Sequence, residues 1–92
     1  MNPLAQAVSL IIKEQQQIIG PLAIDQAKKV PGITIISPQE VQLTGDGKTI
    51  LTNLINEYSK IFGQASIQVC KEALEPVIDK LLPTDLPDIL KS

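Results

Sequence analysis

The stretch VSLIIKEQQQIIG (residues 8–20) aligns without a gap to the stretch LTNLINEYSKIFG (residues 51–63) when the chain is shifted by 43 residues. The closing glycines, Gly20 and Gly63, coincide. Apolar residues recur along both stretches at alternating steps of three and four, which is the periodicity of an amphipathic helix. Two helices easily share such a stripe by chance, but they less easily share a glycine as well. The pattern therefore predicts an internal duplication.

The predicted duplication divides the chain into two tandem helical repeats, at about residues 3–45 and 47–92. Outside the two stretches, Lys28 also matches Lys71. One unit has an apolar stripe that it cannot bury alone, whereas two units related by a pseudo-two-fold axis bury both stripes together. We predict a single all-α domain, residues 1–92, folded as a small helical bundle.

Proline and glycine set the expected helix boundaries. Asn2 and Pro3 are typical of a helix start. The dipeptide Gly20-Pro21 predicts a kink or an end of the first helix, because proline lacks an N–H and biases its predecessor away from the α region. The second long helix is expected to run from about Lys48 to the break at Pro76. A short segment is expected around residues 86–90.

Between the two long helices the sequence predicts no sheet. The β-branched run Ile33–Ile36 is suited to an extended conformation, but no partner strand is evident. Ser37, Pro38 and Glu40 form a capping pattern that predicts a short helix ending before Gly45. We expect helix in more than 60% of residues and at most a two-residue β-bridge.

Four positions on or beside the stripes carry more specific expectations. The matched glycines allow a close approach of two helices, which we favour, or they absorb a bend. Gln15 is a polar residue on an apolar stripe, where it fixes the pairing of the helices or reaches out to water. Cys70 is expected to be a small buried hydrophobic residue.

Composition excludes several classes of protein. The chain is 43% hydrophobic with one Phe, one Tyr and no Trp, so its core must be aliphatic. A net charge of −2 without arginine argues against nucleic-acid binding. No segment approaches the roughly 20 apolar residues of a membrane span. The single cysteine fits a reducing compartment, and we expect a cytoplasmic protein.

The sequence motifs that would indicate a catalytic or ligand-binding site are incomplete. Asp46-Gly47-Lys48-Thr49 is similar to part of a phosphate-binding loop, but that loop needs glycine where Gln42 stands. We interpret the stretch as a helix start capped by Asp46 or Thr49. Without histidine, and with one cysteine, zinc sites and Cys–His pairs lack their residues. We expect no catalytic, cofactor or metal site, and no enzyme.

The stretch Ile18-Ile19-Gly20-Pro21-Leu22-Ala23, followed by Ala27-Lys28, resembles small helical modules appended to prokaryotic signalling proteins. The second copy departs from the motif, with Gln64 in place of the proline. The resemblance implies a role in association or signalling, and it assigns no catalytic or binding residue.

We therefore predict a non-catalytic interaction or oligomerisation module that pairs with itself, as a homodimer, or with another helical protein. Apolar residues beside the main stripes, together with the matched glycines, form the predicted interface: Ile12, Ile19, Gly20, Ile55, Phe62 and Gly63. The alternative function is a carrier of a small apolar ligand, such as a lipid tail, between aliphatic helices.

Overall fold

A computed structural model of the chain describes residues 3–37 and 40–81. Helical residues make up 74% of this part, which confirms the expected helix content. The elements in chain order are α1 (Pro3–Ile19), α2 (Leu22–Lys28), β1 (Ile33–Ser37), β2 (Glu40–Leu43), α3 (Gly47–Phe62), α4 (Gln64–Leu74) and the 3-10 helix η1 (Glu75–Lys80).

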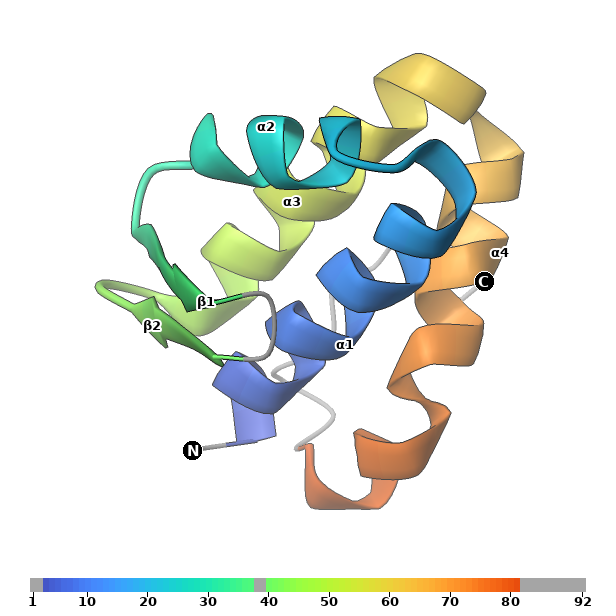
Figure 1. Cartoon of the computed structure of the whole chain (residues 1–92). Coiled ribbons are helices and arrows are strands. Elements are labelled where there is room, and N and C mark those ends of the chain that lie inside the picture. Colours follow the sequence, from blue (N-terminus) through green and yellow to red (C-terminus); the bar gives the residue numbers. More distant parts are fainter. Residues whose placement is uncertain (1–2, 38–39, 82–92) are drawn as a thin grey trace.

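Helix α1 is the centre of the arrangement. It packs against α2, α3, α4, β2 and η1. Figure 1 shows the β-hairpin and α4 on opposite sides of α1, with α2 lying across one end. The core lies where α1, α3 and α4 meet, and the first stripe positions of both long helices, Val8, Ile11, Leu51 and Leu54, are fully buried in it. These four burials agree with the predicted stripes.

The two matched glycines end helices. Gly20 has φ +67°, and its N–H donates to the carbonyl of Gln16 at 2.9 Å, so α1 stops there and α2 begins after Pro21. Gly63 has φ +60°, and its N–H donates to the carbonyl of Ser59 at 2.7 Å. A Cβ atom added at either glycine would meet nothing within 4 Å. The expected close approach of helices at these positions is therefore wrong, and each glycine instead provides a left-handed backbone conformation for a turn.

The second half thus contains two helices where the sequence predicted one. The expected helix from Lys48 to Pro76 is interrupted at Gly63, whose ψ of −133° takes the backbone out of helical geometry. The backbone therefore turns at this glycine, and α4 begins at Gln64. Only η1 lies beyond the end of α4 at Leu74 in the described chain. The segment expected around residues 86–90 lies outside the described residues.

A two-stranded antiparallel hairpin replaces the predicted short helix. Strand β1 pairs with β2 in the register Ile33 with Leu43 and Ile35 with Val41, and the register shifts before Ser37. Val41 is buried and Leu43 is partly buried, while Glu40 and Gln42, which alternate with them, are exposed. This alternation with a period of two is that of a strand with one face on the core. The prediction of no sheet was wrong because the partner strand was interpreted as a helix.

Candidate interaction surface

The structure places two of the predicted interface residues inside the molecule. Ile12 on α1 and Ile55 on α3 both have an exposed fraction of 0% and belong to the core cluster. They extend the apolar arc of their helices inward, onto the other helices of the chain. Their side chains are consequently not available to a partner, and any interface must be drawn without them.

The other predicted interface residues lie at the ends of α1 and α3. Ile19 is partly buried against the core, Gly20 is half-buried, and Gly63 is exposed. Phe62 is the last residue of α3, and its side chain lies outside the described part of the structure. Among the predicted residues whose burial the structure describes, no continuous exposed surface is brought together.

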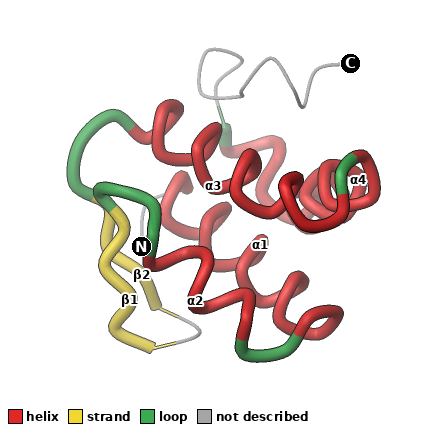
Figure 2. The backbone as a smooth tube through the Cα atoms, turned by 90° about the horizontal axis from the view of Figure 1, so that it is seen from above, coloured by secondary structure: helices red, strands yellow, loops and turns green. Residues whose placement is uncertain are grey.

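Five large apolar side chains are exposed in the described chain: Ile36 on β1, Ile78 on η1, and Ile18, Leu22 and Ile61 at the last positions of the stripes. Ile18 and Leu22 are 55% and 41% exposed, and they flank the turn between α1 and α2. In the second half the matched positions are Ile61, which is 37% exposed, and Ala65, which is also exposed. Figure 2 shows the α1–α2 turn at the edge of the molecule. The periodicity places these residues on the apolar stripes, but Ile18 and Ile61 lie in the last turns of α1 and α3, where the other elements leave them exposed.

Buried polar side chains link the helices of the two halves. Gln15 on α1 is 1% exposed, and its Nε2 donates to the backbone carbonyl of Ser66 at 3.4 Å and to the Sγ of Cys70 at 3.8 Å. The hydroxyl of Tyr58 on α3 donates to the backbone carbonyl of Ala23 on α2 at 2.8 Å. Gln15 therefore does not reach out to water, and its position fits the role of fixing how the helices pair.

The turn between α3 and α4 has its own polar contact. Ser66 is 1% exposed, and its Oγ donates to the carbonyl of Tyr58 at 2.9 Å. This bond joins the last turn of α3 to the first turn of α4, across Gly63. The side chain thereby holds the two helices at the angle that the glycine permits.

The buried titratable groups stay neutral near pH 7. Burial raises the pKa of the Cys70 thiol to about 11, although the hydrogen bond from Gln15 acts in the opposite direction. Burial, together with the charge of a Cys70 thiolate, raises the pKa of Tyr58 well above its ordinary value. A thiolate is the nucleophilic form of cysteine, so this environment suppresses reactivity at Cys70. The residue is buried as predicted, with an exposed fraction of 0%.

Asp46 caps the start of α3. Its Oδ2 accepts hydrogen bonds from the Thr49 hydroxyl at 2.6 Å and from the Thr49 backbone N–H at 3.0 Å. These two bonds lower the pKa of Asp46. The interpretation of this stretch as a capped helix start is confirmed, and the capping residue is Asp46.

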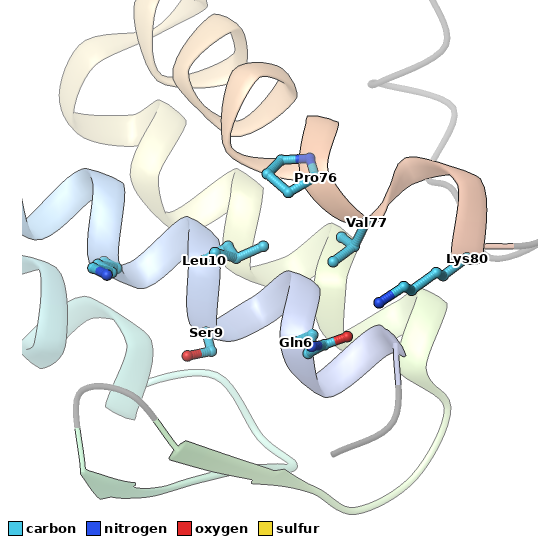
Figure 3. Close-up of a pocket in the computed structure, with 7 residues that line it drawn as sticks. Gln6, Ser9, Leu10, Pro76, Val77 and Lys80 are labelled. Carbon is cyan, nitrogen blue, oxygen red and sulfur yellow. The ribbon is translucent and has the colours of Figure 1, made fainter.

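A groove of about 390 Å³ lies between α1 and η1. It is lined by Gln6, Ser9, Leu10, Lys13, Pro76, Val77 and Lys80. Figure 3 shows Leu10 pointing from α1 toward Pro76 and Val77, while Lys80 extends toward Gln6. The floor is aliphatic and the rim carries two lysines. The sequence did not predict this groove, because the groove exists only where η1 packs beside α1, and the sequence pattern does not specify that packing.

A second hollow, of about 440 Å³, has a more polar lining and lies between the end of α2 and the middle of α3. Lys29 and Asn53 are among the residues that line it. Lys60 at its edge is 3.4 Å from the carboxylate of Glu57, one turn earlier on α3. An exposed pair of this kind contributes less than about 1 kcal/mol. This hollow presents both charge signs and therefore favours no ligand of a single charge.

In residues 3–37 and 40–81, no group of three or more acidic, histidine or cysteine side chains is placed to hold a metal ion. Within the same part of the chain, no helix has the length and apolar character needed to cross a membrane. The absence of a metal-binding group does not extend to Asp85 and Asp88, two acidic residues near the end of the sequence that lie outside the described residues. Comparison of the chain with protein-family models, curated proteins and solved structures found no match in any of the three.

Proposed function

We propose that the protein is a non-catalytic association module that forms a homodimer through its α1–α2 corner, defined by Ile18 and Leu22. The observation that carries this proposal is the exposure of these two large aliphatic side chains at a turn free of charge. No charged residue occurs between residues 15 and 24, in a chain that is 20% charged. Centres of protein interfaces are depleted of charge in the same way. Ile19 of the predicted set lies within this corner, and Ile12 and Ile55 do not take part.

The gain from burying this corner is modest. Full burial of one isoleucine or leucine side chain stabilises by about 1.5–3 kcal/mol. Ile18 and Leu22 are each about half exposed, so together they contribute about as much as one such side chain per protomer. A two-fold symmetric dimer uses the corner twice and gains about 3–6 kcal/mol. Association itself costs at least about 4 kcal/mol, so these side chains only about offset that cost, and the proposed dimer needs further contacts around the corner and forms only at high protein concentration.

We also propose that the fold arose by tandem duplication, with the two halves related by a pseudo-two-fold axis. The shift of 43 residues that aligns the sequence carries Gln15 onto Tyr58 and Ala23 onto Ser66. Gln15 donates to the Ser66 carbonyl, and Tyr58 donates to the Ala23 carbonyl. Exchanging the halves therefore converts one hydrogen bond into the other, which supports the symmetry.

This reciprocity bears on function. Each long helix sends its polar side chain to the second helix of the other half, as two protomers do in an isologous dimer. Each proposed repeat already pairs with its own copy within one chain. This favours the proposal that the same kind of unit also pairs between two chains. The second half has a matching charge-free stretch, residues 61–70, which spans its own helix-ending glycine, Gly63.

The cellular setting is proposed from the sequence. A single buried cysteine supports a reducing, cytoplasmic compartment. The similarity of the Ile18–Ala23 stretch to modules of prokaryotic signalling proteins supports a role in bringing signalling partners together. In that role the homodimer, and not the single chain, binds the signalling partners.

Light scattering coupled to size-exclusion chromatography tests the proposed corner. Ile18→Asp places a charge in the interface and should weaken dimerisation at least tenfold, whereas Gln17→Asp adds the same charge to a neighbouring exposed position and should leave it almost unchanged. Circular dichroism confirms that both variants fold. Equal masses for the two variants and the wild type would exclude the corner as the interface. A bound lipid in the native mass spectrum of a monomer would favour the ligand carrier instead.

A further inference from the structure

The groove between α1 and η1 has a chemistry distinct from that of the α1–α2 corner. Leu10, Pro76 and Val77 provide an aliphatic floor, and Lys13 and Lys80 stand exposed at its rim. None of the described residues that line the groove is acidic, so its rim is positively charged. A complementary occupant therefore combines aliphatic side chains with carboxylates.

The α1 wall of the groove is a stripe of about two helical turns. Its residues share one face of the helix, because they stand at positions i, i+3, i+4 and i+7: Gln6, Ser9, Leu10 and Lys13. From Gln6 to Lys13 the stripe is roughly 10 Å long at the helical rise per residue. Lys80 extends toward Gln6 (Figure 3), and Lys13 is at the other end of the stripe. The two ammonium groups therefore flank the aliphatic floor from opposite ends.

An amphipathic helix presents carboxylates at the same spacing. Two acidic residues seven positions apart lie on one face of a helix, also roughly 10 Å apart, and the residues three and four positions after the first lie between them. Helices with apolar anchors at such positions bind in hydrophobic grooves. In an extended strand, by contrast, residues about 10 Å apart are three positions apart and point to opposite faces. A helix therefore fits the two lysines better than a strand does.

We propose that the α1–η1 groove binds an amphipathic helix of a partner protein, with two acidic residues seven positions apart and leucine or isoleucine between them. The acidic residues pair with Lys13 and Lys80, and the aliphatic residues pack on Leu10 and Val77. The inference concerns a surface other than the α1–α2 corner and does not depend on dimerisation.

A second copy of the chain does not offer this pattern. In the sequence, only Glu72 and Asp79 are acidic residues seven positions apart. The positions between them that would face the groove are Glu75 and Pro76, neither of which is an aliphatic anchor. The charge and spacing of the groove therefore favour a different protein as the partner.

Fluorescence anisotropy of the full chain with labelled peptides tests this. The probe is an alanine-based helical peptide with two glutamates seven positions apart and two leucines between them on the same face. The matched peptide has the same composition, but its glutamates lie on the face opposite the leucines. We expect the first peptide to bind at least fivefold more tightly than the second. Binding should also shift the methyl resonances of Leu10 and Val77.

Charge reversal in the protein tests the role of the two lysines. Lys13→Glu with Lys80→Glu should weaken binding of the first peptide at least fivefold, because two attractions become repulsions. A peptide with lysines in place of its glutamates should bind this variant more tightly than it binds the wild type. Lys28→Glu with Lys29→Glu, at the exposed end of α2, changes the net charge equally and should have little effect. Circular dichroism confirms that both variants fold.

Four results would overturn the proposal. The first is no binding of the peptide up to about 1 mM. The second is equal affinity for the two peptides, or equal weakening by the two pairs of lysine substitutions, since binding would then follow net charge alone. The third is methyl shifts of Leu10 and Val77 that depend on protein concentration without peptide, which would make the occupant a second copy. The fourth is decanoate shifting these methyls at lower concentration than the peptide, which would make the occupant a small anionic amphiphile.

Discussion

Replacing Tyr58 with phenylalanine removes one buried hydrogen bond between α3 and α2 and leaves the ring in place. The hydroxyl donates to the Ala23 carbonyl at 2.8 Å, and the residue has an exposed fraction of 0%. No cavity larger than one oxygen atom is created, so the loss is that of the hydrogen bond itself. Such a bond contributes about 1 kcal/mol, with a range of about 0.5–1.5 kcal/mol. In a domain of this size, that corresponds to a decrease of roughly 4–8 °C in Tm.

Urea unfolding followed by circular dichroism measures this change. We expect a lower midpoint and an unchanged slope, because the surface exposed on unfolding stays the same. Ser59→Ala is the matched control, since its hydroxyl donates to the Asn56 carbonyl within the same helix on an exposed site. Its effect should be within about 0.5 kcal/mol of zero. A Tyr58→Phe variant as stable as the wild type would refute the structural importance of the link between the halves.

Two further predictions concern stability. Gly63→Ala places a side chain at φ +60° and ψ −133°, and it should lower the free energy of unfolding in urea by about 1–3 kcal/mol; no change would mean that the turn between α3 and α4 differs from the one described. Burial raises the pKa of Tyr58 and raises that of Cys70 to about 11. Both groups therefore contribute stability that is fully present below their unfolded-state pKa values and lost as the pH rises toward the folded-state values. The free energy of unfolding should fall above about pH 9, and less steeply in Cys70→Ala; a flat profile to about pH 11 would contradict this.

Local signals in the sequence were sufficient to predict the long helices. The stripe through Val8 and Ile11 identifies the buried face of α1, and its repeat through Leu51 and Leu54 does so for α3. An interruption at Gly20-Pro21 was also predictable, as either a kink or an end of the helix, because proline lacks the N–H that a continuing helix needs. At Gly63 no proline follows, so the same backbone turn left a weaker signal in the sequence.

The hairpin illustrates competing local preferences. Ser37, Pro38 and Glu40 match a helix start, whereas the alternation from Glu40 to Leu43 matches a strand. The β-branched run at Ile33–Ile36 decides between them only if a partner strand is considered. Pairing across the chain and contact of β2 with α1 then outweigh the short capping pattern.

The candidate surface was less predictable than the fold. A helical stripe shows which face is apolar, but it does not show how far along the helix the core extends. The apolar stripe that continues through Ile18 and Leu22 was expected to be buried between the two repeats, and Ile12 and Ile55 were assigned to an interface. Their real environments depend on where neighbouring helices lie, which one stripe does not specify.

Sedimentation equilibrium of the wild-type chain, from micromolar concentrations to several hundred micromolar, tests the proposed association most directly. We predict a mass that rises with concentration toward about 20 kDa, twice the 10.0 kDa of one chain. A mass that stays at 10.0 kDa across the whole range would contradict self-association and would require the partner at the α1–α2 corner to be a different protein.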